Sequence, residues 1–104
     1  MESFNYILVK ESLICLLSSW GYDTYPNFRL KNSKGEDRIV DIYAKHVSGK
    51  IVLIEILEKP NKREEKIIKS FYEQTHPIIF YESEFRKDSN SFKNHLLEKF
   101  KEYK

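Results

Sequence analysis

The chain has 104 residues, of which 40% are hydrophobic and 14% aromatic, with only three glycines and three prolines. These values fit one folded domain over residues 1–104 with a single core, and they exclude a low-complexity or disordered chain. The 18 basic and 16 acidic residues give a formal net charge of +2, so total charge says little about partners.

A lone cysteine, Cys15, excludes an internal disulfide and fits a reducing compartment. No apolar run approaches the ~20 residues that span a bilayer, and the N-terminus lacks the features of a signal peptide. The sequence therefore predicts an intracellular protein, cytoplasmic or nuclear, that does not enter a membrane.

Residues 4–20 are predicted to form a helix that ends at Gly21. Its apolar residues fall into two stripes on opposite sides of the helix. One stripe comprises Phe4, Ile7, Leu8, Ile14 and Cys15, and the other comprises Val9, Leu13, Leu16, Leu17 and Trp20. Because the helix is apolar nearly all round, we expect it to be covered on both sides, by the sheet and by something else such as a partner chain, with Cys15 in the core.

Three strands are predicted next. "NFRL" (27–30) is a short strand candidate, "RIVDIYAKH" (38–46) is rich in β-branched residues, and "IVLIEIL" (51–57) is almost wholly apolar. The turn "VSGK" joins the last two, which indicates an antiparallel hairpin or meander.

The second half of the chain is predicted to begin with a helix over 61–74, after Pro60 ends the third strand. Its expected inward residues are Ile67, Ile68 and Phe71. "PIIFY" (77–81) is typical of an interior strand. A final amphipathic helix carries Phe92, Leu96, Leu97, Phe100 and Tyr103. The order α-β-β-β-α-β-α predicts an α/β or α+β domain with a mixed central sheet flanked by helices.

Three acidic residues interrupt apolar patterns: Glu11 in the first helix, Asp41 in the second strand and Glu55 in the third. A buried, unpaired carboxylate costs several kcal/mol, so folds keep one where it is paired, hydrogen-bonded or bound to a metal. If the second and third strands pair, Asp41 and Glu55 can point to the same side and repel unless a cation bridges them. Mg²⁺ is the natural bridge, and it could polarise a phosphodiester.

A structural alternative stays open for each acid. Asp41 and Glu55 could lie near strand ends or on a wetted face, paired with Lys45 or Lys59, and Glu11 could lie on the exposed side of its helix. A basic cluster follows the third strand and comprises Lys59, Lys62, Arg63, Lys66 and Lys69. These side chains could bind phosphate or form a solvated helix face.

Over residues 4–82 the chain resembles the PD-(D/E)XK, or restriction-endonuclease-like, nuclease superfamily. "ESLICLLSSWGYDTYPNFRL", "GEDRIVDIYA" and "IVLIEIL" resemble its glutamate helix, aspartate strand and glutamate strand. The resemblance implies a Mg²⁺- or Mn²⁺-dependent DNA endonuclease, with Glu11, Asp41 and Glu55 as metal ligands. A homodimer would serve two-strand cutting, through the second stripe of the first helix or through the last helix.

The family's third strand carries Glu-x-Lys, whereas this chain has Leu57 at the lysine position, which argues for reduced or lost activity. The candidate catalytic residues are Asp41, Glu55 and, as the substitute for the lysine, Lys59, which shares the strand parity of Glu55 if the strand continues that far. Lys66 and Lys69 on the following helix are further candidates for the lysine, although their helical angles favour solvent or phosphate. Lys62, Arg63, Lys66 and Lys69 are then expected to contact phosphate.

A second resemblance implies a different function. "EKPNKREEKIIKSFYEQ", "PIIFYES" and "SFKNHLLEKF" are similar to segments of the jaw domain of the fifth subunit of eukaryotic RNA polymerases. This implies a non-catalytic nucleic-acid-binding or transcription-associated module. A structural dimer with no nucleic-acid role is a third possibility.

Overall fold

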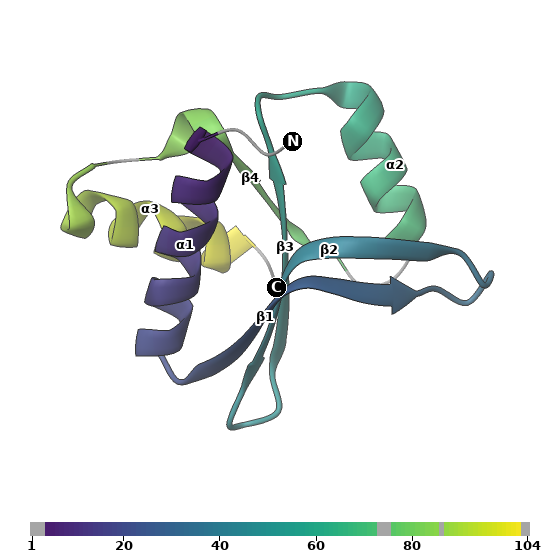
Figure 1. Cartoon of the computed structure of the whole chain (residues 1–104), viewed down its shortest axis with the longest axis horizontal. Coiled ribbons are helices and arrows are strands. Elements are labelled where there is room, and N and C mark those ends of the chain that lie inside the picture. Colours follow the sequence, from purple (N-terminus) through teal and green to yellow (C-terminus); the bar gives the residue numbers. More distant parts are fainter. Residues whose placement is uncertain (1–3, 73–75, 86, 103–104) are drawn as a thin grey trace.

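Four strands form one mixed sheet in the order β1-β2-β3-β4 (Figure 1). The strands β1 (Tyr22–Lys31), β2 (Asp37–His46) and β3 (Ile51–Leu57) pair antiparallel, and β4 (Ile78–Tyr81) pairs parallel to β3. The computed structural model describes residues 4–72, 76–85 and 87–102.

Helices cover both faces of the sheet. On one face lie α1 (Phe4–Ser19) and α3 (Ser89–Glu102), and on the other lies α2 (Lys62–Tyr72), as Figure 1 shows. A short 3-10 turn, η1 (Glu82–Glu84), follows β4. The protein is therefore a small single-domain α+β fold, which confirms the predicted order of elements and the predicted sheet flanked by helices.

Each face of the sheet has its own core. The larger core lies between the sheet and helices α1 and α3, and it comprises Val9, Leu13, Leu17, Ile42, Ala44, Val52, Ile54, Ile56, Ile78, Phe80, Phe92 and Leu96. The smaller core lies under α2 and comprises Val40, Leu53, Ile68, Phe71 and Tyr72. β3 contributes to both cores, and this explains why it is apolar at almost every position.

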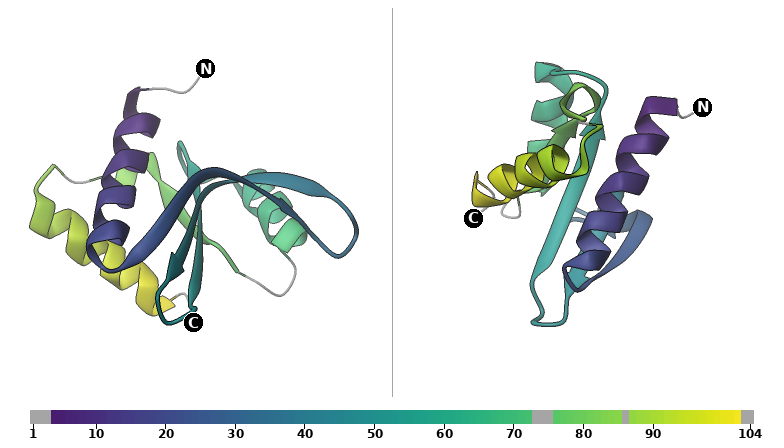
Figure 2. Two further views of the ribbon diagram at one scale, coloured as in Figure 1. Left: turned by 60° about the horizontal axis from the view of Figure 1, so that its bottom comes forward. Right: turned by 90° about the vertical axis from the view of Figure 1, so that its left-hand side faces the viewer.

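The β1–β2 hairpin bends, so that its far end lies on the α2 side of the sheet. The ladder between β2 and β3 runs from Lys45, which pairs with Ile51, to Ile42, which pairs with Ile54. Beyond Ile42 the hairpin curves away, and its turn reaches the α2 side (Figure 2, left). There the Asn32 side chain donates to the carbonyl oxygen of Phe71 at 3.2 Å. The bend brings the start of β2 over the face that α2 covers.

The strands differ from the prediction at both edges of the sheet. The first strand spans ten residues rather than four, and it includes Pro26. An edge strand tolerates proline because one row of its N–H groups has no ladder partner. The segment 77–81, expected as an interior strand, forms the edge strand β4. Its apolar side chains are explained by cover on both faces rather than by strands on both sides.

The helices also correct several expectations. Residues of the second stripe of α1 form its buried side, whereas Ile7 and Leu8 are 45% and 36% exposed. Cys15 is exposed, so its predicted place in the core is wrong. The sheet covers the second stripe of α1, and cover of the other side by something else, such as a partner chain, stays a prediction. On α2, Ile67 faces out and Tyr72 is buried instead.

The last helix is amphipathic, as predicted, with Phe92 and Leu96 buried and Leu97 largely exposed. Tyr103 lies outside the described residues. Across the described ranges, none of the helices combines the length and the apolar character that crossing a membrane requires.

Candidate functional site

Glu55 is buried on the α2 face of the sheet, and both its oxygens are hydrogen-bonded. Arg38 Nε donates to Oε2 at 2.7 Å and Arg38 Nη2 donates to Oε1 at 3.2 Å. The Tyr72 hydroxyl donates to Oε2 at 2.6 Å. Glu55 is 2% exposed, so the acid that interrupts β3 is held by a forked ion pair and a phenol. We call Arg38, Glu55 and Tyr72 the Glu55 triad.

Three different elements bring the triad together. Arg38 stands near the start of β2, in the part of the hairpin that has left the β3 ladder. Tyr72 is the last residue of α2 and is 8% exposed. The triad therefore joins the hairpin, the central strand and α2.

The protonation states in the triad follow from its contacts. The hydrogen bond to Glu55 raises the pKa of Arg38, against an opposing effect of burial. Burial raises the pKa of Tyr72, and the hydrogen bond to Glu55 and the Glu55 charge raise it further. Arg38 thus remains a cation and Tyr72 remains a neutral hydrogen-bond donor, and both functions suit a carboxylate acceptor.

Asp41 is bound from the opposite face of the sheet. Its Oδ1 accepts a hydrogen bond from the hydroxyl of Tyr6 on α1. Its Oδ2 accepts from the backbone N–H of Ile56 at 2.7 Å. Since the β2–β3 ladder stops at Ile42, the Asp41 carboxylate supplies the acceptor that this N–H would otherwise lack. Asp41 therefore has a structural role at the point where the two strands part.

A buried lysine beside Tyr6 was not predicted from the sequence. Lys10 is 6% exposed, and its Nζ donates to Oδ1 of Asn27 at 2.6 Å. The same Nζ lies 5.2 Å from the centroid of the Tyr6 ring. Asn27 adopts φ 53°, a left-handed conformation that asparagine tolerates better than most residues. The only sequence signal is the spacing of four residues between Tyr6 and Lys10, which places both on one side of a helix.

Glu11 lies apart from both of the other acids. It is exposed and lines a pocket of about 300 Å³. The other residues around that pocket are Ser12, Cys15, Leu16, Phe85, Lys87 and Phe92. Glu11 thus faces the side of α1 toward α3, whereas Lys10 faces β1.

As arranged, these three carboxylates do not fit one Mg²⁺ or Mn²⁺ ion. Each oxygen of Asp41 and of Glu55 already accepts a hydrogen bond, and the two side chains are bound from opposite faces of the sheet. Within residues 4–72, 76–85 and 87–102, no three His, Cys, Asp or Glu are grouped so that they could hold a metal ion. The metal-ligand roles of Glu11, Asp41 and Glu55 stay a prediction.

The position of the family lysine is filled by packing. Leu57 is half-buried and packs against the smaller core. Lys59, the predicted substitute, is exposed and lies beyond the end of β3, in the bend before α2. The catalytic role of Lys59 stays a prediction. The cation that is hydrogen-bonded to Glu55 is Arg38, and not Lys45 or Lys59.

Helix α2 begins with a reciprocal cap. The Asn61 side chain accepts from the N–H of Glu64 at 3.1 Å, and the Glu65 side chain accepts from the N–H of Asn61 at 3.1 Å. Acidic residues in the first turn and Lys69 in the last turn also suit the helix dipole. This helix therefore has local reasons to form, in addition to its buried face.

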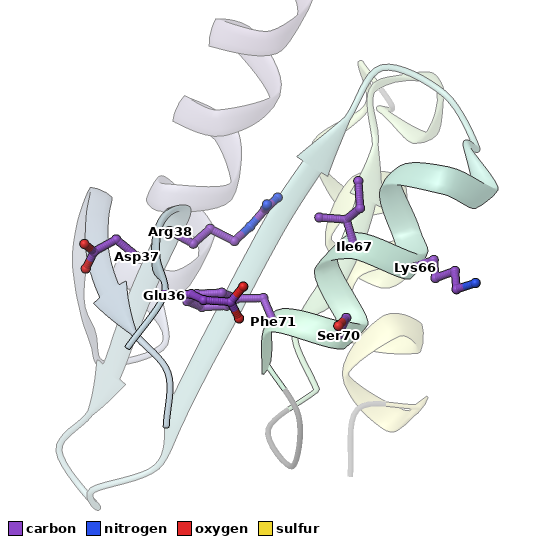
Figure 3. A pocket seen from close by; sticks show the side chains of 7 residues that line it. All are labelled: Glu36, Asp37, Arg38, Lys66, Ile67, Ser70 and Phe71. Atoms are coloured by element: carbon purple, nitrogen blue, oxygen red, sulfur yellow. The ribbon is translucent and has the colours of Figure 1, made fainter. Parts of the chain in front are cut away.

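The outer face of α2 presents basic side chains, all of them exposed. Lys62, Lys66 and Lys69 are four and three residues apart, so they project within about 60° of one another along about 10 Å of helix. Arg63 lies about 100° from Lys62. We call these four residues the α2 basic face. Lys66 also lines a groove of about 400 Å³ between α2 and the hairpin (Figure 3).

No protein-family description, characterised protein or solved structure matches the chain.

Proposed function

We propose that the protein binds nucleic acid through the α2 basic face and does not cleave it. One observation carries the proposal: both oxygens of Glu55 are engaged by Arg38 and Tyr72, while the basic residues of the helix beside it are exposed. The acid best placed for metal chemistry is thus used to hold α2, and α2 offers charge to a polyanion. This favours the non-catalytic module that the jaw-domain resemblance implies.

The geometry of the α2 basic face suits a phosphate backbone. Lysine is a flexible point charge, and contacts to phosphate position a protein on nucleic acid without reading its sequence. Duplex DNA carries one charge per ~1.7 Å of axis, so a face about 10 Å long meets several phosphates at once. We expect weak, sequence-independent binding whose affinity falls steeply with salt.

The alternative is a Mg²⁺- or Mn²⁺-dependent endonuclease with Glu11, Asp41 and Glu55 as ligands and Lys59 in place of the family lysine. It requires Glu55 to exchange Arg38 for a metal ion. A homodimer, through α1 or α3, would be needed to cut both strands. The test of binding also tests this alternative when divalent metal is included.

The test compares two triple variants with the same change of charge. K62Q/K66Q/K69Q removes three charges from the α2 basic face, and K45Q/K50Q/K93Q removes three exposed charges from β2, the β2–β3 turn and α3. Fluorescence anisotropy with labelled duplex, branched and single-stranded DNA is measured against KCl concentration. The first variant should lose most of the affinity at low salt, and the second should keep most of it.

Gel assays of the same samples with Mg²⁺ or Mn²⁺ test for cleavage. Intact DNA with salt-dependent binding supports the module. Cleavage by the wild type that is lost in both Asp41→Asn and Glu55→Gln would establish the endonuclease instead. If the wild type does not bind at low salt, the proposal is wrong.

A further inference from the structure

We infer that the Arg38 guanidinium acts as the built-in counter-cation of Glu55 and keeps divalent metal ions away from it. The inference deepens the proposed function, and one part of it rests on that function: if α2 binds nucleic acid, this binding should not require a metal ion at Glu55.

The contacts of Glu55 leave it little to offer an ion. The Arg38 fork engages one lone pair on each oxygen, at 2.7 and 3.2 Å, and the Tyr72 hydroxyl engages Oε2 again at 2.6 Å. Mg²⁺ requires oxygen ligands at ~2.0–2.1 Å in octahedral geometry. An ion that approached so closely would have to displace the guanidinium or lie against it, and two cations in contact repel.

Arg38 also lies between Glu55 and solvent. The Arg38 side chain is 24% exposed, whereas the Glu55 side chain is 3% exposed. Arg38 lines the groove between the hairpin and α2, together with Glu36, Asp37, Lys66, Ile67, Ser70 and Phe71 (Figure 3). Glu55 does not line this groove. An ion that enters from the groove therefore meets the guanidinium before it meets the carboxylate.

Removal of the guanidinium would change the charge of the groove. Besides Arg38, the charged residues that line the groove are Glu36, Asp37 and Lys66. Without Arg38, the Glu55 carboxylate would lose its cation beside a groove whose lining residues include Glu36 and Asp37. Hard divalent ions bind more tightly as the number of carboxylate ligands rises, so the variant should gain an ion that the wild type refuses.

The arrangement also affects α2. Tyr72 ends the helix and donates to the same Glu55 oxygen as Arg38 Nε, so the helix that carries the basic face is fixed to the sheet through a carboxylate whose counter-cation is Arg38. A protein that needed Mg²⁺ at Glu55 to order α2 would lose nucleic-acid binding with a chelator. This protein should keep it.

The experiment measures Mn²⁺ bound to the protein without DNA, from the electron paramagnetic resonance signal of free Mn²⁺. Wild type and Glu55→Gln should bind Mn²⁺ equally. Arg38→Met, which keeps most of the side-chain volume, should bind Mn²⁺ about tenfold more tightly than Arg38→Met/Glu55→Gln. If Arg38→Met does not fold, Arg38→Gln with its matched double variant replaces it, since glutamine is uncharged and can still donate one hydrogen bond.

Two results would overturn the inference. The first is Mn²⁺ binding by the wild type that Glu55→Gln abolishes, because the guanidinium would then not exclude the ion. The second is a folded Arg38 variant that binds no more Mn²⁺ than its matched double variant. Neither result depends on DNA, whereas absence of DNA binding at low salt would refute the proposed function and leave the Mn²⁺ results unchanged.

Discussion

Arg38 and Glu55 form a forked ion pair between β2 and β3 at a place where the backbone ladder between these strands has already ended at Ile42. Beyond Ile42, where the backbone ladder has ended, these two side chains connect β2 to β3. Tyr72 adds α2 to the same carboxylate. A residue that interrupts an apolar strand therefore joins three elements of the fold.

The ion pair should show strong coupling in a double-mutant cycle. Arg38→Met leaves a buried carboxylate without its cation, and we expect a loss of about 3 kcal/mol in the free energy of unfolding. Arg38→Met/Glu55→Gln removes both charges and should recover part of that loss. Urea unfolding of the wild type, both single variants and the double variant measures the coupling. Additive effects would show that the pair contributes nothing beyond its separate side chains.

The Tyr72 hydroxyl can be tested alone. Tyr72→Phe keeps the ring in the smaller core and removes one donor to a buried carboxylate, so we expect a loss of about 1–3 kcal/mol. Tyr25→Phe is the matched control because Tyr25 is 46% exposed, and its effect should stay within about 0.5 kcal/mol. Equal effects of the two changes in thermal unfolding would argue against the contact with Glu55.

Asp41 should prove structural. Asp41→Ala leaves the N–H of Ile56 and the hydroxyl of Tyr6 without their acceptor and should cost about 2–3 kcal/mol. Asp41→Asn keeps one acceptor oxygen and should cost about half as much. Chemical denaturation ranks the two variants. If Asp41→Ala is as stable as the wild type, Asp41 does not stabilise the end of the β2–β3 ladder.

A separate carboxylate predicts how stability changes with pH. Burial tends to raise the pKa of Glu84, but hydrogen bonds from Lys99, from the N–H of Tyr81 and from His95 outweigh it and lower the pKa below its ordinary value of 4.5. Lys99 Nζ and His95 Nε2 lie 2.6 and 2.5 Å from its oxygens. These contacts join η1 to α3.

The sign follows from linkage. A carboxyl group with a lower pKa in the folded state contributes stability above its unfolded pKa and loses it as the pH falls through the folded pKa. The unfolding temperature should therefore drop as the pH falls from about 5 through the folded pKa of Glu84, and Glu84→Gln should reduce that drop. Glu58→Gln, at an exposed position, is the control. A pH profile that Glu84→Gln leaves unchanged would contradict the assignment.

Much of the fold could be predicted because its elements carry local signals. Helix α1 ends at Ser19, two residues before Gly21 with its positive φ, and β3 is apolar because it lies between two cores. Glu55 is recognisable as unusual in the sequence because it is a carboxylate within this apolar strand. Its partner is not, because Arg38 reaches Glu55 only after the hairpin bends away from β3, and no spacing in the sequence encodes that bend.

The errors also have physical causes. Periodicity showed two apolar stripes on α1 but not which one meets the sheet, so Cys15 was placed in the core although it is exposed. The apolar run in β4 does not distinguish an interior strand from an edge strand that has helices on both faces. The burial of Lys10 has no local signal because its partner Asn27 is distant in sequence.

The most direct test of the account is the affinity of the wild-type protein for duplex DNA in EDTA, measured by anisotropy over a range of KCl concentrations. With about three phosphate contacts from the α2 basic face, log affinity should fall against log salt concentration with a slope of about −3. K62Q/K66Q/K69Q should abolish most of the binding, and K45Q/K50Q/K93Q should not. Binding that appears only with Mg²⁺, or that is insensitive to salt, would contradict the account.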